Sequence, residues 1–216
     1  MNTISISIWG IALALYLVFL VWHENWRGPL TQSEIETFMA RIEANETVDD
    51  MQRAALLDFM ETDTGNEFFM VNLLAFPKGT VTHPDTGEQV SPPDLLQEYF
   101  RPFMGKTIMS AGYPAYTGRA VGGYLDAWAA QANPGWSAGG IIRYRSRRDM
   151  LEAATDPSFE GGHVYKRAAL SVTYAMPLET NAGGVLMSPR IWLAFLLTAL
   201  AALGHLVYLI FRTTNA

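Results

Sequence analysis

The stretch SAGGIIRYRSRRDMLEAATD, residues 137–156, predicts a strand followed by a helix. Residues 137–145 form the expected strand. Ser146 opens the helix as its N-cap, with Asp149 three residues later at the capping-box position. Asp156 precedes Pro157, and proline disfavours helical backbone at the residue before it, so the helix should end there. This strand-to-helix unit is the best-marked part of the domain.

The residues on either side of this unit add three strands and one long helix. Residues 67–76, EFFMVNLLAF, carry apolar side chains on both faces, which is typical of a strand between a helical layer and a second buried surface. The remaining stretches predict a loop in residues 82–94, a helix kinked at Pro102 in residues 95–109, and strands in residues 115–124 and 171–177. The order βαββαβ predicts an α+β fold of the ferredoxin-like type.

Two amphipathic helices are expected before the first strand, in residues 24–63. Thr31 and Glu34 form a capping box, after which apolar residues recur at helical spacing. Thr47 is the expected cap of the second helix. An apolar stripe usually faces a packing neighbour, so we expect this hairpin to pack on the adjoining domain; a partner-binding hairpin is the alternative.

Two long apolar stretches flank the domain. Residues 4–22 and 191–211 contain no acidic or basic residue apart from one histidine, and about 20 helical residues span the hydrocarbon core of a bilayer. The expected organisation is a transmembrane helix in residues 1–23, the hairpin in 24–63, the α+β domain in 64–180, a linker in 181–190 and a second transmembrane helix in 191–212.

The basic residues near the spans predict an orientation. Arg27 and Arg190 lie on the domain side of the two spans, and Arg212 lies on the other side. Because basic residues near spans favour the cytoplasmic side, we expect a cell (inner) membrane protein with two spans, whose domain is cytoplasmic and whose first partner is the lipid bilayer.

Composition excludes several classes of function. Residues 23–190 hold all 21 acidic residues and 14 of the 15 basic ones, so nucleic acid is not an expected partner. The chain has no cysteine and no glycine-rich phosphate loop after a strand. Its four histidines show no paired metal-ligand spacing, and no metal site is expected.

The stretches FFMVNLLAF and WSAGGIIRYRSRRDMLEAATDPSFEGGHVYKRAAL resemble the domain-of-unknown-function family 1330, within the dimeric α+β barrel class. The resemblance covers residues 66–178. It implies a ferredoxin-like domain whose sheet meets a second sheet across a dimer interface to close a barrel, and it implies no established reaction. The family is usually soluble, so the two spans and the helical hairpin are departures from it.

A second resemblance, to haem-degrading monooxygenases of the same barrel class, concerns single positions. Asn72 on the first strand, Tyr144 before the second helix and His163 in FEGGH match residues that those enzymes use. The resemblance implies that His163 could ligate haem iron and that Asn72 could donate a hydrogen bond to bound oxygen. Those enzymes carry tryptophan where Tyr144 stands. In the alternative interpretation, Asn72 satisfies a backbone group and His163 lies at a loop edge.

The polar residues between 156 and 167 have two interpretations. Asp156, Glu160, His163 and Arg167 could form a reaction centre, or they could be a helix stop, a solvated acid, an edge histidine and a salt-bridge partner. Pro157 and two glycines disfavour the helical backbone that would pair the carboxylates. We expect the cluster to be structural.

The second span contains one histidine. His205 follows a row of small residues at helical spacing, namely Ala194, Thr198 and Ala202, and we expect this face to contact another membrane helix. A haem shared with His23 is excluded, because the two histidines differ in depth by about 21 Å at the helical rise. A haem between two copies of His205 stays open.

The sequence therefore predicts a membrane-anchored α+β barrel protein that forms a homodimer and serves as a binding or accessory module of a membrane assembly, without a required cofactor. Val172, Tyr174 and Met176 of the last strand are expected at the dimer interface. The alternative is a cofactor-free or haem-dependent monooxygenase. An open cavity onto which Asn72, Tyr144 and His163 converge would favour that alternative.

Overall fold

The chain divides into two compact units. A computed structural model describes residues 3–45, 48–157, 162–180 and 188–214. The central unit is Arg27–Glu179, and the helical unit combines Met1–Trp26 with Thr180–Ala216. The elements in chain order are α1 Thr3–His23, α2 Gln32–Asn45, α3 Asp50–Glu61, β1 Phe68–Ala75, β2 Val81–Thr82, β3 Gln89–Val90, α4 Pro92–Met109, β4 Tyr113–Arg119, β5 Ala138–Tyr144, α5 Arg147–Ala154, α6 Gly162–Ala169, β6 Val172–Leu178 and α8 Pro189–Thr214.

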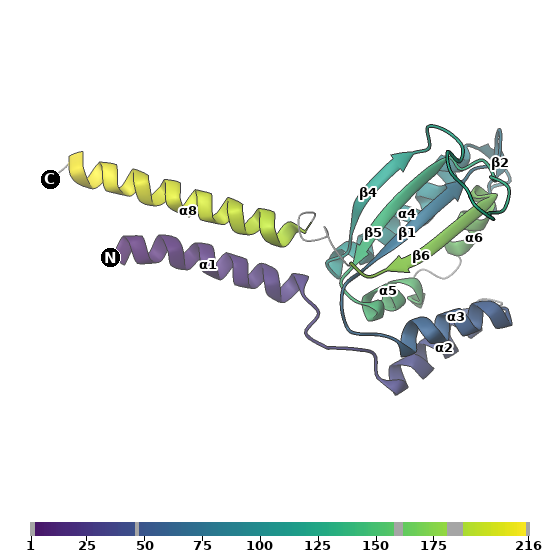
Figure 1. The fold of residues 1–216 in the computed structure, drawn as a ribbon, viewed down its shortest axis with the longest axis horizontal. Helices are drawn as coiled ribbons and strands as arrows, with labels where there is room; N and C mark the ends of the chain where they lie inside the picture. Colours follow the sequence, from purple (N-terminus) through teal and green to yellow (C-terminus); the bar gives the residue numbers. More distant parts are fainter. Residues whose placement is uncertain (1–2, 46–47, 158–161, 181–187, 215–216) are drawn as a thin grey trace. The chain divides into compact units, whose positions relative to one another are not determined.

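The central unit is built on a four-stranded antiparallel sheet in the order β4-β5-β1-β6 (Figure 1). Strand β1 pairs with β5 on one side and with β6 on the other. The predicted α+β architecture is confirmed. Helices α4 and α6 pack on each other and, with α5, form the helical layer on the sheet.

The core lies between this helical layer and the sheet. Phe68 of β1 and Tyr144 of β5 face each other in the strand register, and their rings stack with centroids 5.2 Å apart. Leu95 and Phe103 of α4 join the same buried cluster. A fully buried apolar side chain of this size contributes about 1.5–3 kcal/mol, so this end of the sheet is firmly packed.

Three boundaries differ from the sequence-based expectation. Strand β4 ends at Arg119 instead of residue 124, and residues 120–137 connect it to β5. The expected loop 82–94 contains part of the β2–β3 hairpin, and α4 starts at Pro92, because proline is tolerated in the first helical turn. Pro157 separates two helices, α5 and α6, where one helix followed by loop was expected.

Helices α2 and α3 begin at well-defined caps. The predicted capping box of α2 is present: the Thr31 amide donates to Glu34 at 2.9 Å, and the Glu34 amide donates to the Thr31 hydroxyl at 3.4 Å. The N-cap of α3 is Asp49, which accepts a 2.7 Å hydrogen bond from the Gln52 amide. Thr47, the expected cap, lies outside the described residues. Apolar side chains of α2 and α3 form a second core cluster with Leu151 of α5.

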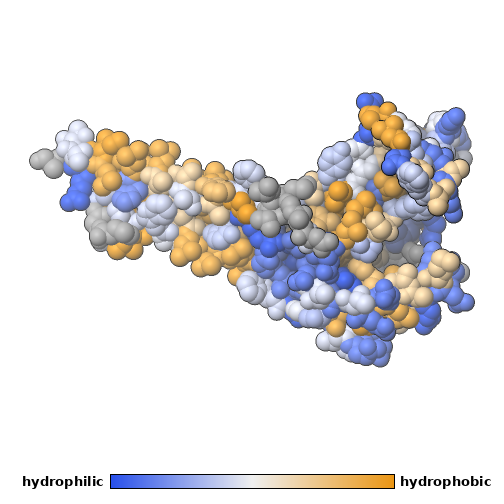
Figure 2. All heavy atoms as spheres, in the orientation of Figure 1, coloured by the Kyte–Doolittle hydropathy of each residue, from blue (hydrophilic) through white to orange (hydrophobic). Residues whose placement is uncertain are grey.

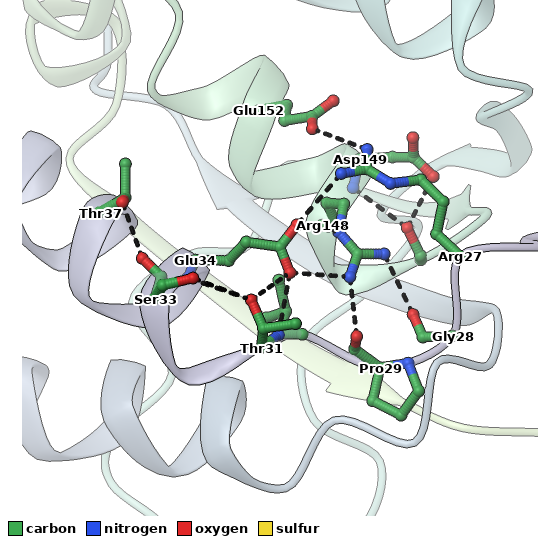
Figure 3. A network of polar contacts seen from close by, with 12 residues as sticks. Arg27, Gly28, Pro29, Thr31, Ser33, Glu34, Thr37, Arg148, Asp149 and Glu152 are labelled. Atoms are coloured by element: carbon green, nitrogen blue, oxygen red, sulfur yellow. Dashed lines mark hydrogen bonds and ion pairs between the residues drawn. The ribbon is translucent and has the colours of Figure 1, made fainter.

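Arg148 of α5 connects the α2–α3 hairpin to the helical layer (Figure 3). Its guanidinium donates to both carboxylate oxygens of Glu34, at 2.8 and 3.0 Å, and to the carbonyl oxygens of Gly28 at 3.0 Å and Pro29 at 2.7 Å. The hydrogen bond from Arg148, reinforced by the Thr31 amide, lowers the pKa of Glu34 from 4.5 to about 2. One buried cation thereby fixes the start of the central unit and α2 against α5.

The helical unit consists of α1 and α8, which run side by side (Figure 1). By length and composition both could cross a membrane, and only 6% of the apolar segment of each is buried. Apolar residues gather on the surface of both helices (Figure 2). At one end of the pair, the Arg190 guanidinium lies 3.2 Å from the Glu24 carboxylate.

His205 joins the two helices. Trp9 Nε1 donates to His205 Nδ1 at 3.3 Å, so the imidazole proton is on Nε2, which lies 3.1 Å from the Ser5 hydroxyl. The face that packs on α1 is rotated relative to the predicted row. Ala194 is half-buried and Ala201 is buried, whereas Thr198 and Ala202 are exposed.

Candidate functional site

A cavity of about 850 Å³ lies within the central unit, between the sheet and helices α4, α5 and α6. Cavities that bind small molecules commonly have volumes of about 300–1,000 Å³. Its lining comprises Met70, Asn72, Leu74, Phe76, Leu96, Gln97, Tyr99, Phe100, Phe103, Thr117, Gly118, Arg119, Ser137, Ala138, Gly139, Gly140, Ile142, Tyr144, Met150, Ala154, His163, Lys166 and Ala175. Most of these side chains are apolar, and few are charged.

Small residues on the sheet create this space. Gly140 of β5 pairs with Asn72 of β1 and Thr117 of β4, and Asn72 pairs with Ala175 of β6. Ala138 lies two residues before Gly140 and therefore on the same face of β5. The side chains around Gly140 on this face are therefore short, and the larger Met70 and Leu74 of β1 lie on either side of Asn72. In the sequence, the small residues of SAGG, residues 137–140, indicated only a strand. In the structure they are the feature of the sequence that indicates a cavity.

The cavity has a buried end and an exposed end. Ile142, Tyr144 and Phe103 are 8%, 4% and 6% exposed, and they close the end near the Phe68 core. Gln97, Thr117 and Arg119 are exposed members of the lining. In the strand register, Ala138 pairs with Arg119 on one side and with Leu74 on the other. These three residues lie at the opposite end of β5 from Tyr144. The cavity therefore opens toward Arg119.

All three candidate catalytic residues line this cavity. The Asn72 side-chain amide donates to the Met70 carbonyl at 3.0 Å, as the backbone-satisfying interpretation expects. Burial raises the pKa of the Tyr144 phenol above its usual range. His163 of α6 has its ring centroid 5.5 Å from that of Tyr99. The three residues, which come from β1, β5 and α6, therefore line one cavity.

The other polar residues between 156 and 167 do not share one environment. Asp156 forms an ion pair with Lys106 of α4, Arg167 is exposed, and Glu160 lies outside the described residues. Of Asp156, His163 and Arg167, the members that the structure describes, only His163 lines the cavity. Among the described residues, no group of three or more His, Asp or Glu side chains could hold a metal ion.

The arginines of the run RYRSRR, residues 143–148, form ion pairs with carboxylates of the same unit. Arg143 donates to Glu67 at 2.9 and 2.6 Å, Arg145 donates to Asp149 at 2.8 and 2.6 Å, and the Arg147 guanidinium lies 3.1 Å from Glu179. Arg148 is held by Glu34, as described above. These guanidinium groups stabilise the unit and leave the run unsuited to binding an external anion.

Comparison with known proteins shows the fold and no function. No family model matches the chain, and no curated protein matches it. It is similar to the crystal structure of methylated RPA0582 protein, with a TM-score of 0.52 and 18% identity over 65% of this chain and 98% of that chain. A second structure of RPA0582, a protein of unknown function from Rhodopseudomonas palustris, gives a TM-score of 0.51 and 17% identity over 64% of this chain and all of that chain.

The fold class is therefore that of RPA0582, an α+β protein with no known function. In this chain one long apolar helix precedes that fold in the sequence and another follows it. The resemblance of residues 66–178 to the domain-of-unknown-function family stays a prediction.

Proposed function

We propose that the central unit binds a small, largely apolar molecule in the cavity beneath helices α4, α5 and α6. The observation that carries this proposal is the cavity itself, about 850 Å³, whose sheet side includes Ala138, Gly140 and Ala175. A sheet that served only as a scaffold would be covered by large side chains, because protein interiors are close-packed. The cavity is in contrast apolar, open at one end and large enough for a ligand.

We propose further that α1 and α8 anchor this binding unit in a cell membrane as a two-span hairpin, with the central unit on the cytoplasmic side. The length and hydropathy of both helices support anchoring. His205 supports it as well, because an imidazole inside a bilayer needs partners such as Ser5 and Trp9. A protein of this design would act as a ligand-binding subunit of a membrane assembly.

A monooxygenase-like activity is the second candidate. The observation that favours it is that Asn72, Tyr144 and His163 line the same cavity. His163 would be the residue that holds a haem in this cavity, and Arg119 and Lys166 of the lining could pair with its carboxylates. A visible spectrum of the purified protein distinguishes the two functions, since bound haem absorbs strongly.

Filling the cavity tests the proposed function. Ala138→Leu should reduce the affinity for decanol, a neutral apolar probe, by about tenfold or more, because the added side chain enters the space the probe would occupy. The measurement is calorimetric titration of the full chain in lipid nanodiscs, with empty nanodiscs subtracted. Thr173→Leu, an exposed change on β6 outside the lining, is the matched control and should bind as the wild type does. Equal binding by Ala138→Leu would contradict the proposal.

We also propose that the central unit forms a homodimer through the sheet face opposite the cavity. Val172, Tyr174 and Met176 alternate along β6, and the last two are 54% and 55% exposed. Leu73 of β1, 38% exposed, pairs directly with Tyr174. A contiguous exposed apolar face of this kind supports an interface with a second copy of the chain.

Met176→Lys should therefore convert the dimer to a monomer, because it would place a charge at the centre of a buried apolar contact. Sedimentation of the full chain in detergent measures the change. Val164→Lys, on an exposed apolar position of α6, adds the same charge on the helical side and should leave the dimer intact. A wild-type monomer, or a dimer that survives Met176→Lys, would rule out this interface.

A further inference from the structure

The charges around the cavity have a single sign. Arg119 and Lys166 are the charged side chains among the described residues of the lining, and none of those residues is acidic. This is unexpected for residues 23–190, where acidic residues outnumber basic ones by 21 to 14. Two cations, with no carboxylate among the described lining residues, favour an anion over a neutral or cationic ligand.

Arg119 is suited to bind such an anion. Within the described residues it makes no ion pair, in contrast to Arg143, Arg145, Arg147 and Arg148. It lies at the exposed end of the cavity, where a charged group can stay hydrated on one side. A guanidinium presents a planar pair of donors that matches the two oxygens of a carboxylate. Lys166 adds a second positive charge, with Nζ 5.4 Å from the Tyr99 ring centroid.

The rest of the ligand must be apolar and elongated. From Arg119 the cavity follows the sheet past Leu74 and Asn72 to Met70, where Ile142 pairs with Met70. Four residues of strand correspond to about 13 Å. Along this length the helices contribute Leu96, Phe100 and Phe103, whose side chains bind hydrocarbon.

We infer that the cavity takes a single-headed amphipathic carboxylate, with its carboxylate at Arg119 and its apolar body directed toward Ile142 and Tyr144. This inference rests on the proposed ligand-binding function and adds the chemical class of the ligand. Fatty acids and elongated aromatic acids share this chemistry, and both place one charge at the mouth and hydrocarbon in the buried part of the cavity.

The test compares three probes of equal chain length, decanoate, decanol and decylammonium, with the full chain in nanodiscs of zwitterionic lipid. We expect decanoate to bind most tightly. Arg119→Gln should weaken decanoate by about tenfold, the scale of one charge-assisted hydrogen bond, and leave decanol unchanged. Arg101→Gln removes the same charge from an exposed position of α4 outside the lining and should change neither probe.

The possible outcomes distinguish a failure of the carboxylate assignment from a failure of the proposed ligand-binding function. If decanol binds as tightly as decanoate and Arg119→Gln changes neither, the cavity binds apolar molecules and the carboxylate assignment is wrong. If none of the probes binds more weakly to Ala138→Leu than to the wild type, the ligand-binding function itself fails. A comparison of naphthalene acetate with decanoate identifies which class of carboxylate the cavity prefers. Tighter binding of naphthalene acetate indicates aromatic acids, and tighter binding of decanoate indicates fatty acids.

Discussion

Replacing Arg148 with methionine should lower the free energy of unfolding of the central unit by about 3 kcal/mol. The substitution leaves the Glu34 carboxylate and the carbonyl oxygens of Gly28 and Pro29 without their shared donor. Breaking a buried ion pair usually costs about 3–5 kcal/mol. The lower end applies here because the Glu34 side chain is 25% exposed to solvent. For a unit of this size the melting temperature should fall by about 10 °C.

The pH dependence of this loss identifies its cause. The folded pKa of Glu34 is about 2, below its ordinary value of 4.5, so its ionised form stabilises the fold at higher pH. That contribution is fully present above pH 4.5 and is lost as the pH falls toward 2. The difference in unfolding free energy between the wild type and Arg148→Met should therefore shrink over this range, as followed by denaturant unfolding at several pH values.

Arg101→Met is the matched control for Arg148→Met. It removes an arginine from an exposed position of α4 and should change the unfolding free energy by less than about 0.5 kcal/mol. If Arg148→Met unfolds like this control, the network of Figure 3 contributes little, and packing of the two core clusters holds the hairpin in place.

Gly65→Ala should destabilise the central unit by about 2–4 kcal/mol. Gly65 has a φ of +76°, and an added Cβ would lie 2.7 Å from the Gly28 carbonyl carbon and 2.8 Å from the Pro29 nitrogen. Both neighbours are backbone atoms, and hydrogen bonds from Arg148 to the carbonyl oxygens of Gly28 and Pro29 restrict their movement. Equilibrium unfolding in denaturant measures the change.

Gly79→Ala separates the two causes of this loss. Gly79 has a similar φ of +83°, but nothing lies within 4 Å of its added Cβ. It should show only the backbone strain, about 1 kcal/mol. Equal losses at the two positions would mean that the close approach of residues 28 and 29 to Gly65 does not occur in solution.

The sheet and its helices could be predicted because their local signals agreed. Apolar residues on both faces of residues 67–76 indicated a buried strand, and the Ser146 cap marked the start of α5. The β4 boundary could not be predicted, because the sequence of residues 115–124 does not reveal that pairing with β5 ends at Arg119. Helix α6 was missed because Pro157 and two glycines obscured a new start at Gly162.

The candidate site was predicted in part. Asn72, Tyr144 and His163 were identified through a resemblance, and the structure brings them to one cavity. The space itself was not predicted, because Ala138 and Gly140 reveal it only when strand register puts them beneath the helices. Arg119 was also missed. A single arginine in a predicted strand is noticed only when it is compared with the ion-paired arginines of RYRSRR.

The pairing of α1 with α8 has a thermodynamic consequence for the unit between them. Both ends of Arg27–Glu179 continue into this helix pair, so the pair closes a loop of about 150 residues around the central unit. As long as the helices stay together, an unfolded central unit remains tethered at both ends and loses chain entropy, much as under a disulfide cross-link. For a loop of this length the chain-entropy model gives about 5 kcal/mol. The α1–α8 pair thus raises the free energy of the unfolded state and changes no contact within the sheet.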